Sequence, residues 1–153
     1  MSPTANFETL TLSGAKAIVA ACEDKARSIN VPMNIAVVDA ATHLIHFSRM
    51  DRAKITSISI SIDKAFTAAG HRLGTHVYKE AVWPGGPAYG IGHSNNNRFT
   101  TIGGGLPIVG ENRQVLGAVG CSNGTPAQDQ EVAQAGVDAA KKLLKESSRS
   151  SKL

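Results

Sequence analysis

Residues Met33–Arg49 read MNIAVVDAATHLIHFSR, and this stretch decides the fold class. Its first part, Met33–Asp39, is rich in Ile and Val, and its second part, His43–Arg49, alternates between two sets of side chains, as strands do. Only Ala40–Thr42 separates the two parts, which is short enough for a β-hairpin. Because the strands of a hairpin are antiparallel, we predict an antiparallel sheet.

Helices are predicted before and after this hairpin. Apolar residues at helical spacing predict a helix from about Leu12 to Ile29, with Thr11 as its N-cap. Residues 54–70 are compatible with two structures, because Ser57–Ile62 alternates like a strand while a longer stripe recurs at helical spacing. The stripe consists of Ile55, Ile58, Ile62, Ala65, Phe66 and Ala69. We predict the helix, since its pattern covers more residues.

A further helix and two further strands are predicted in the second half of the chain. A short helix is predicted over Thr75–Val82, and two strands over Gly105–Val109 and Val115–Cys121. The resulting order is helix, two strands, helices, two or three strands, helix. This order predicts one α+β domain over residues 1–145, in which an antiparallel sheet packs against helices.

A last helix is predicted from Pro126 onward. Thr125 stands at the N-cap position, and Gln128 stands where a capping box requires it. Gly136 lies in the apolar stripe of this helix, which predicts close packing against another element.

The composition excludes several classes of protein. The chain has 153 residues, 42% of them hydrophobic, which suits one globular domain. The formal net charge of +4 is concentrated in residues 141–153, so we expect no basic surface on the folded body and no nucleic-acid partner. No apolar run approaches the roughly 20 residues that cross a bilayer, and the N-terminus does not resemble a signal peptide. We therefore expect no membrane partner.

The sequence ends in Ser151, Lys152 and Leu153, the tripeptide that the peroxisomal import receptor recognises at a free C-terminus. Residues 146–153 are polar, which predicts an exposed tail that presents this tripeptide to the receptor. The predicted location is therefore the peroxisome.

The histidines and cysteines form no metal-binding pattern. His43 and His46 are three residues apart on a predicted strand, so their side chains point to opposite faces. We predict no bound metal ion, and buried free thiols at Cys22 and Cys121. A haem iron needs only one axial ligand from the protein, and we take His93, in a glycine-rich stretch, as a candidate ligand-binding residue.

That stretch runs from about Trp83 to Gly105 and is rich in glycine and asparagine, a composition typical of functional or mobile loops. It ends in Gly103, Gly104 and Gly105, which precede a strand and so match neither a P-loop nor a dinucleotide fingerprint. Two interpretations stay open for these glycines. Their backbone amides bind an anionic ligand, or they form a flexible turn with a β-bulge.

Charged residues follow the hairpin. Arg49 and Asp51 lie close together in sequence, and Lys64 lies on the polar side of the helix predicted over residues 54–70. Asp51 either caps that helix or orients a ligand and accepts a proton, while Arg49 and Lys64 bind a carboxylate. We predict that these three side chains converge beneath Gly103–Gly105.

Eight segments together carry a family resemblance. They are Val37–Asp39, Phe47–Asp51, Ile62–Ala65, Thr67–Ala69, Gly103–Ile108, Gly117–Ser122, Asp129 and Ala135–Gly136. In this order, over roughly residues 10–145, they resemble the GlcG/HbpS-like family, also called the haem-degrading domain family. The chain departs from the family pattern in two places: Arg52 stands where a glycine is usual, and Cys121–Gly124 stands where Val-Ser-Gly-Gly is usual.

The resemblance implies a profilin-like α+β domain with an antiparallel sheet of about five strands. It also favours the helix at residues 54–70. Members of the family typically self-associate, and some bind haem or iron. The resemblance therefore implies a homo-oligomer, with haem as the candidate cofactor.

We favour a peroxisomal protein that binds haem or another anionic metabolite through Arg49, His93 and Gly103–Gly105. The alternative is a cofactor-free isomerase, lyase or hydrolase of a small oxygenated metabolite, with Asp51 and Lys64 as catalytic residues. A third interpretation is an interaction module without chemistry, which the aromatic content of 5% disfavours.

Overall fold

Four strands and seven helical segments make up the computed structural model, which describes residues 1–151. In chain order they are α1 (Leu12–Ser28), β1 (Asn34–Asp39), β2 (Leu44–Arg49), α2 (Ser57–His71), η1 (Thr75–Val77), η2 (Lys79–Val82), η3 (Ile91–His93), α3 (Ser94–Asn97), β3 (Gly105–Val109), β4 (Val115–Ser122) and α4 (Pro126–Ser150). Lys152 and Leu153 of the predicted targeting tripeptide lie outside the described residues.

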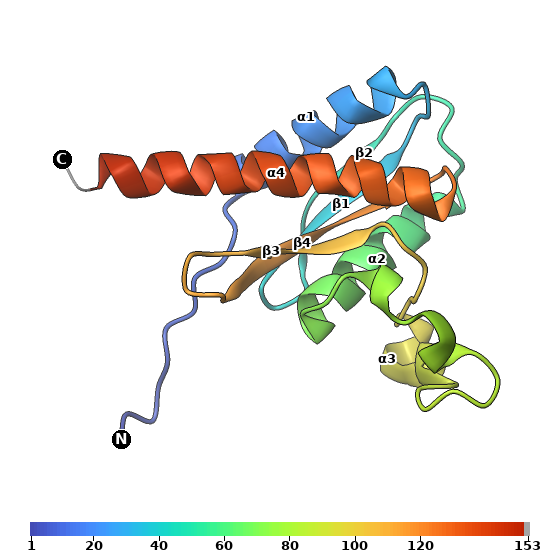
Figure 1. Ribbon diagram of the computed structural model, residues 1–153. Helices are drawn as coiled ribbons and strands as arrows, with labels where there is room; N and C mark the ends of the chain where they lie inside the picture. Colours follow the sequence, from blue (N-terminus) through green and yellow to red (C-terminus); the bar gives the residue numbers. More distant parts are fainter. Residues whose placement is uncertain (152–153) are drawn as a thin grey trace.

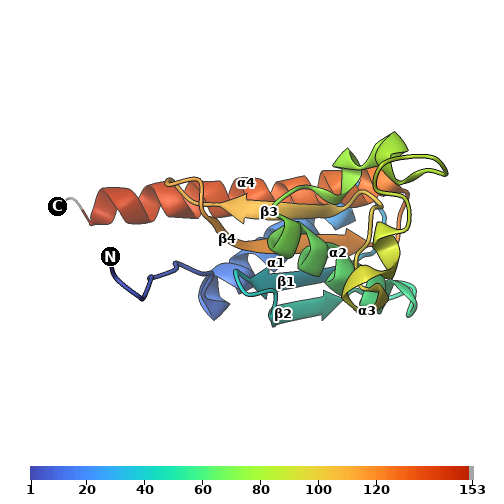
Figure 2. The ribbon, with the colours of Figure 1, turned by 90° about the horizontal axis from the view of Figure 1, so that it is seen from below.

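The strands form one antiparallel sheet in the order β2-β1-β4-β3. Helices α1 and α4 cover one face of the sheet and α2 covers the other (Figures 1 and 2). The α+β prediction is confirmed, although the sheet has four strands where about five were predicted. Within residues 1–151, no helix is long and apolar enough to cross a membrane.

The predicted hairpin is present. Strands β1 and β2 pair from Asn34 opposite Arg49 onward, and the amide of Asp39 donates to the carbonyl of His43 at 2.9 Å to close the turn. Strand β1 also pairs with β4, so it is central and buried on both faces. This is why Met33–Asp39 is apolar almost throughout rather than alternating.

Each face of the sheet has its own apolar core. Ile35 and Val37 of β1 face α1 and α4, whereas Ala36 and Val38 face α2. The α2 side is built largely from alanine and glycine. A Cβ atom on Gly120 would collide with the carbonyl oxygen of Ser61, so the glycine lets α2 approach the sheet closely.

Residues 57–71 form a helix, as predicted for residues 54–70, but the predicted stripe coincides only in part with its buried face. Ala65 and Ala69 of the stripe are buried, whereas Ile55 is exposed and Ile58, Ile62 and Phe66 are only partly buried. The side that meets the sheet instead carries small and polar residues. They are Ser57, Ser61, Lys64, Ala65, Thr67, Ala68 and Ala69.

Both predicted N-caps are confirmed. Thr11 accepts the amide of Gly14 at the start of α1, and Thr125 forms a capping box with Gln128 at the start of α4. Gly136 packs closely against α1, because a Cβ atom there would lie 2.6 Å from Cys22 Sγ.

One local prediction needs correction, and a second is made more specific. The short helix predicted over Thr75–Val82 is instead a pair of 3-10 turns that meet at Tyr78. The predicted exposed tail begins as helix, because α4 continues to Ser150, and residues 146–150 are exposed except for the partly buried Ser148. The end of α4 contacts the rest of the domain, because the Ser148 hydroxyl donates to Glu111 of the β3–β4 turn at 2.8 Å.

Candidate functional site

Lys64 lies inside the protein, so the prediction that it occupies the polar side of its helix is wrong. Its side chain is 1% exposed, and Nζ donates to Asp129 Oδ2 at 2.7 Å and to the carbonyl of Cys121 at 3.0 Å. Asp129 Oδ1 also accepts the amides of Asn123 and Gly124, at 3.2 and 2.9 Å. A buried ion pair with these additional hydrogen bonds ties α2 to β4 and α4. The ammonium group is not accessible to a substrate.

Gly103–Gly105 passes directly over this ion pair. Gly104 has a φ of +120°, and a Cβ atom there would lie 2.7 Å from Asp129 Cβ and 2.9 Å from Lys64 Nζ. The Gly104 amide donates to Gln130 Oε1 at 3.0 Å, and the next amide donates to a threonine hydroxyl at 2.9 Å. The glycines thus bring the backbone against Lys64 and Asp129, and these two amides are engaged within the protein rather than offered to an anion.

Arg49 and Asp51 do not join this group. Arg49 ends β2, whereas Gly105 begins β3, and these strands are the two opposite edges of the sheet. Three strand spacings separate them, which is about 14 Å. Both charged residues are exposed, and α2 begins after Thr56 with no side-chain cap, so Asp51 does not cap it. The predicted convergence of three charges beneath the glycines is therefore wrong.

His93 lies in an exposed 3-10 turn beside a cavity of about 310 Å³ that Tyr89 and Thr101 also line. Ile91 belongs both to this cavity and to a larger neighbour. His93 is thus at the edge of an open cavity that neither Lys64 nor Gly104 lines.

The larger neighbour, which we call the α2 cavity, has a volume of about 660 Å³. It lies between the outer side of α2, the β1–β2 turn and the segment 91–99. Its lining residues are Thr42, Phe66, Thr67, Gly70, His71, Ile91, Ser94, Asn95 and Phe99. This volume and mixture of aromatic and polar groups are typical of small-molecule sites.

His71, Tyr78 and Phe99 form an aromatic cluster at one end of the α2 cavity. Their ring centroids are 5.1 to 5.7 Å apart, and all three pairs meet edge to face. Tyr78 is 8% exposed, and its buried hydroxyl has no hydrogen-bond partner among the described residues. Burial raises the pKa of Tyr78, so its phenol stays protonated at neutral pH. His71 is the exposed member of the cluster.

Arg98 holds the segment 91–99 against α2. Its Nε donates to Asp63 Oδ1 at 2.9 Å, and its guanidinium lies 3.9 Å from the centroid of the Phe66 ring. The preceding residues Asn95–Asn97 all have left-handed backbone conformations, with φ between 53° and 61°. Three such residues in a row are costly, and costs of this kind are concentrated at functional sites.

The two cysteines are buried free thiols, as predicted. Burial, with a contribution from the neighbouring Cys22, raises the pKa of Cys121 well above its usual value. Within residues 1–151, no group of three or more His, Cys, Asp or Glu side chains could hold a metal ion.

Comparison with known proteins identifies the family to which this chain belongs. Residues 10–138 match the family described as "Haem degrading protein HbpS-like". The chain belongs to the HbpS-like family. A 15.0 kDa protein encoded between dhaT and dhaS in Citrobacter freundii is 43% identical over 138 residues, which cover 90% of this chain and 96% of that protein.

Several solved structures share this fold, among them protein ORFY of Klebsiella pneumoniae and a PduOC–haem complex. Protein ORFY of Klebsiella pneumoniae is 42% identical with a TM-score of 0.89, and the match covers 92% of this chain and 97% of that one. A crystal structure of a PduOC–haem complex is 27% identical with a TM-score of 0.80, and the match covers 86% of this chain and 94% of that one.

Inference from sequence misses the residues that line the α2 cavity. The helical pattern places Phe66 in a buried stripe, and nothing in the sequence neighbourhood of His71 marks it as a site residue. Phe99 and Arg98 lie about thirty positions further on, at the end of the asparagine run. That run is the one available signal, since left-handed backbone is tolerated best by asparagine among non-glycine residues.

Proposed function

We propose that this protein binds haem in the α2 cavity. The observation that carries the proposal is the combination, in one cavity, of an accessible imidazole, His71, with the aromatic walls Phe66 and Phe99. Haem requires an apolar slot, an axial ligand and cations near its two carboxylates. Arg98 beside Phe66 is a suitable cation, because its pair with Asp63 engages Nε and leaves the two terminal nitrogens for a carboxylate. The exposed His71 imidazole is a suitable ligand. The protonated Tyr78 phenol is not.

The family and the 27% identical PduOC–haem complex support this proposal. In the proposed complex of this protein with haem, His71 would hold the iron and Arg98 would pair with a haem carboxylate. Phe66 and Phe99 would exclude water from the faces of the macrocycle. Bound haem would supply redox and oxygen-binding chemistry. The protein's own contribution is to bind the group and to set the polarity of its surroundings.

Haem titration of the purified protein tests the proposal. We expect a saturable Soret band, and we expect His71→Ala to weaken binding at least tenfold and to change the spectrum. His76→Ala is the matched control, because His76 is also exposed but lines neither the α2 cavity nor the cavity beside His93. If His76→Ala or His93→Ala abolishes the band while His71→Ala does not, haem does not bind in the α2 cavity.

We also propose that the protein is peroxisomal, on the basis of Ser151, Lys152 and Leu153. Helix α4 ends at Ser150, immediately before this tripeptide, and its last residues are exposed. A fluorescent protein fused to the N-terminus should colocalise with peroxisomes in a eukaryotic cell. Deletion of Leu153 should make the signal diffuse, and an unchanged distribution would contradict the proposal.

The enzyme hypothesis required Asp51 and Lys64 to lie in one accessible site. Asp51 is instead exposed on the surface, and Lys64 is buried in an ion pair. Self-association stays a prediction, which light scattering coupled to size-exclusion chromatography tests directly. The mass of the monomer is 16.0 kDa.

A further inference from the structure

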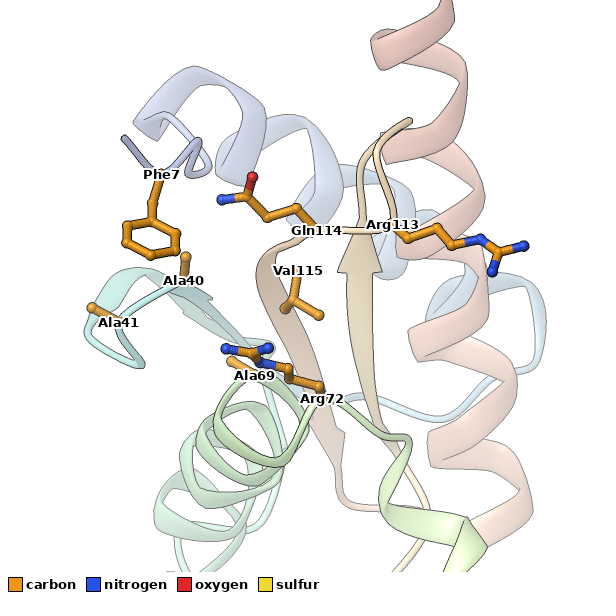
Figure 3. A pocket seen from close by; sticks show the side chains of 8 residues that line it. All are labelled: Phe7, Ala40, Ala41, Ala69, Arg72, Arg113, Gln114 and Val115. Atoms are coloured by element: carbon orange, nitrogen blue, oxygen red, sulfur yellow. The ribbon is translucent and has the colours of Figure 1, made fainter. Parts of the chain in front are cut away.

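A second cavity lies at the turn end of the sheet, and like the α2 cavity it is lined by residues of the β1–β2 turn and of the end of α2. We call it the turn cavity. It has a volume of about 370 Å³ and is shown in Figure 3. Its walls come from the β1–β2 turn, the end of α2, the start of β4 and the N-terminal segment. Its lining includes Phe7, Ala40, Ala69, Arg72, Gln114 and Val115.

One side of the turn cavity is apolar. Ala40, Ala69 and Val115 present only methyl groups to it, and the Phe7 ring lies beside Ala40 at its open side (Figure 3). Phe7 is 74% exposed, so its ring has a large free face. Such a surface favours a flat apolar body, which would cover the methyl groups and stack on the ring.

The other side of the turn cavity is cationic. The Arg72 side chain extends beneath Val115 toward the β1–β2 turn, into the hollow (Figure 3). Among residues 1–151, Arg72 makes no ion pair. A guanidinium without a carboxylate partner, facing a cavity, is a bidentate receptor for an oxyanion.

The acids of the surrounding turns do not compete for Arg72. Asp39 Oδ1 accepts the amides of Ala41 and His43 at 2.8 and 2.9 Å, and so is held in its own turn. Glu111 of the β3–β4 turn accepts the hydroxyl of Ser148. The positive charge of Arg72 therefore remains available to a ligand.

Polar contact is also available from Gln114, whose amide points across the cavity toward Phe7 (Figure 3). Its Nε2 donates weakly to the carbonyl of Glu8 at 3.4 Å, which leaves its oxygen free. Arg113 belongs to the rim of the cavity, but its side chain extends away from it (Figure 3). Arg72 is thus the one arginine of the pair that is directed inward.

We propose that the turn cavity binds a small organic carboxylate with a flat apolar body. The carboxylate pairs with Arg72, the body lies on Ala40, Ala69 and Val115, and Phe7 closes over it. This site is separate from the proposed haem site and does not depend on it. No covalent step is involved.

Benzoate is the probe, and titration of the full-length ¹⁵N-labelled protein followed by NMR is the measurement. We expect saturable shifts of the amides of Ala40, Ala69 and Gln114 and weaker binding to benzamide, which has the same shape without the charge. Inorganic phosphate should bind at least tenfold more weakly than benzoate. Equal binding of benzoate and benzamide, or of benzoate and phosphate, would overturn the proposal.

Arg72→Gln should lower the affinity for benzoate about ten- to a hundredfold, the loss expected for one charge-assisted hydrogen bond. Arg113→Gln is the matched control, because both arginines are exposed residues with left-handed backbone, at φ 61° and 59°, and differ in where they point. We expect the control to change the affinity less than about twofold. Equal losses in the two variants would reveal a general effect of net charge and would refute the site.

A carboxylate on Arg72 has a second candidate source, a carboxylate of haem bound in the neighbouring α2 cavity. The titration repeated in the presence of saturating haem distinguishes the two. We expect unchanged benzoate affinity, and unchanged haem affinity in Arg72→Gln. Displacement of benzoate by haem, or weaker haem binding in Arg72→Gln, would assign Arg72 to haem and overturn the separate site.

Discussion

Removing one partner of the buried Lys64–Asp129 ion pair should destabilise the protein far more than removing a partner of an exposed pair. At the observed Nζ–Oδ2 distance of 2.7 Å, the attraction is about 6 kcal/mol at an effective dielectric constant of about 20. Burial of each ion costs several kcal/mol, so the pair as a whole contributes little net stability. Lys64→Met leaves a buried carboxylate without its counterion, and the expected loss is about 3–5 kcal/mol of unfolding free energy.

The two partners are not equivalent. Asp129 keeps two backbone amide donors after Lys64→Met, whereas the Lys64 ammonium keeps only the carbonyl of Cys121 after Asp129→Leu. Asp129→Leu also leaves the amides of Asn123 and Gly124 without their acceptor. We therefore expect Asp129→Leu to be the more costly of the two.

The assay is urea unfolding followed by circular dichroism, with the unfolding free energy extrapolated to water. The control is Lys25→Met, which breaks the Lys25–Glu131 pair. That pair has the same 2.7 Å distance, but its side chains are 34% and 48% exposed, so the expected loss is about 0–1 kcal/mol. The double variant Lys64→Met/Asp129→Leu should regain much of the loss, since no charge is then buried alone. If Lys64→Met costs no more than Lys25→Met, then burial does not make the Lys64–Asp129 pair costly to break, and the reasoning is refuted.

Three further predictions concern stability. Gly104→Ala should lower the free energy of unfolding by more than about 2 kcal/mol, because φ is +120° and the new Cβ atom would collide with Asp129. The control is Gly92→Ala, which should lower it by less than about 1 kcal/mol, because the nearest atom to the new Cβ lies 3.6 Å away. Thermal unfolding compares the two variants. Thr125→Ala should cost about 1 kcal/mol through the lost N-cap, measured in the same way, and an unchanged Tm would contradict the capping box. The pKa of the Cys121 thiol is raised in the folded protein, so the unfolded chain loses this proton at lower pH than the folded one. The free energy of unfolding should therefore be unaffected by this thiol below the unfolded pKa of about 8.5 and should fall above it, by at most about 1.4 kcal/mol per pH unit. Cys121→Ala should reduce this slope between about pH 8.5 and 10, as measured by urea titrations.

Much of the fold follows from local pattern. The Met33–Arg49 hairpin and the caps at Thr11 and Thr125 depend on residues close in sequence, and each is present as predicted. Prediction failed where local preference and tertiary packing differ. Residues 57–71 form a helix, but it presents alanines and Lys64 to the sheet, because a helix packed this closely has room only for small side chains and for a lysine that finds a buried partner.

Local sequence is enough to specify the order of the elements, the antiparallel hairpin and the position of the glycines, because these depend on backbone preferences acting over a few residues. Which charges meet is settled by the packing of the whole chain. Packing joined Lys64 to Asp129 across 65 positions, left Arg49 and Asp51 in solvent, and brought His71 beside Phe99 and Arg72 beside Val115. Contacts of this kind depend on how whole helices and strands pack, and no short-range pattern in the chain encodes the pairing of side chains that far apart.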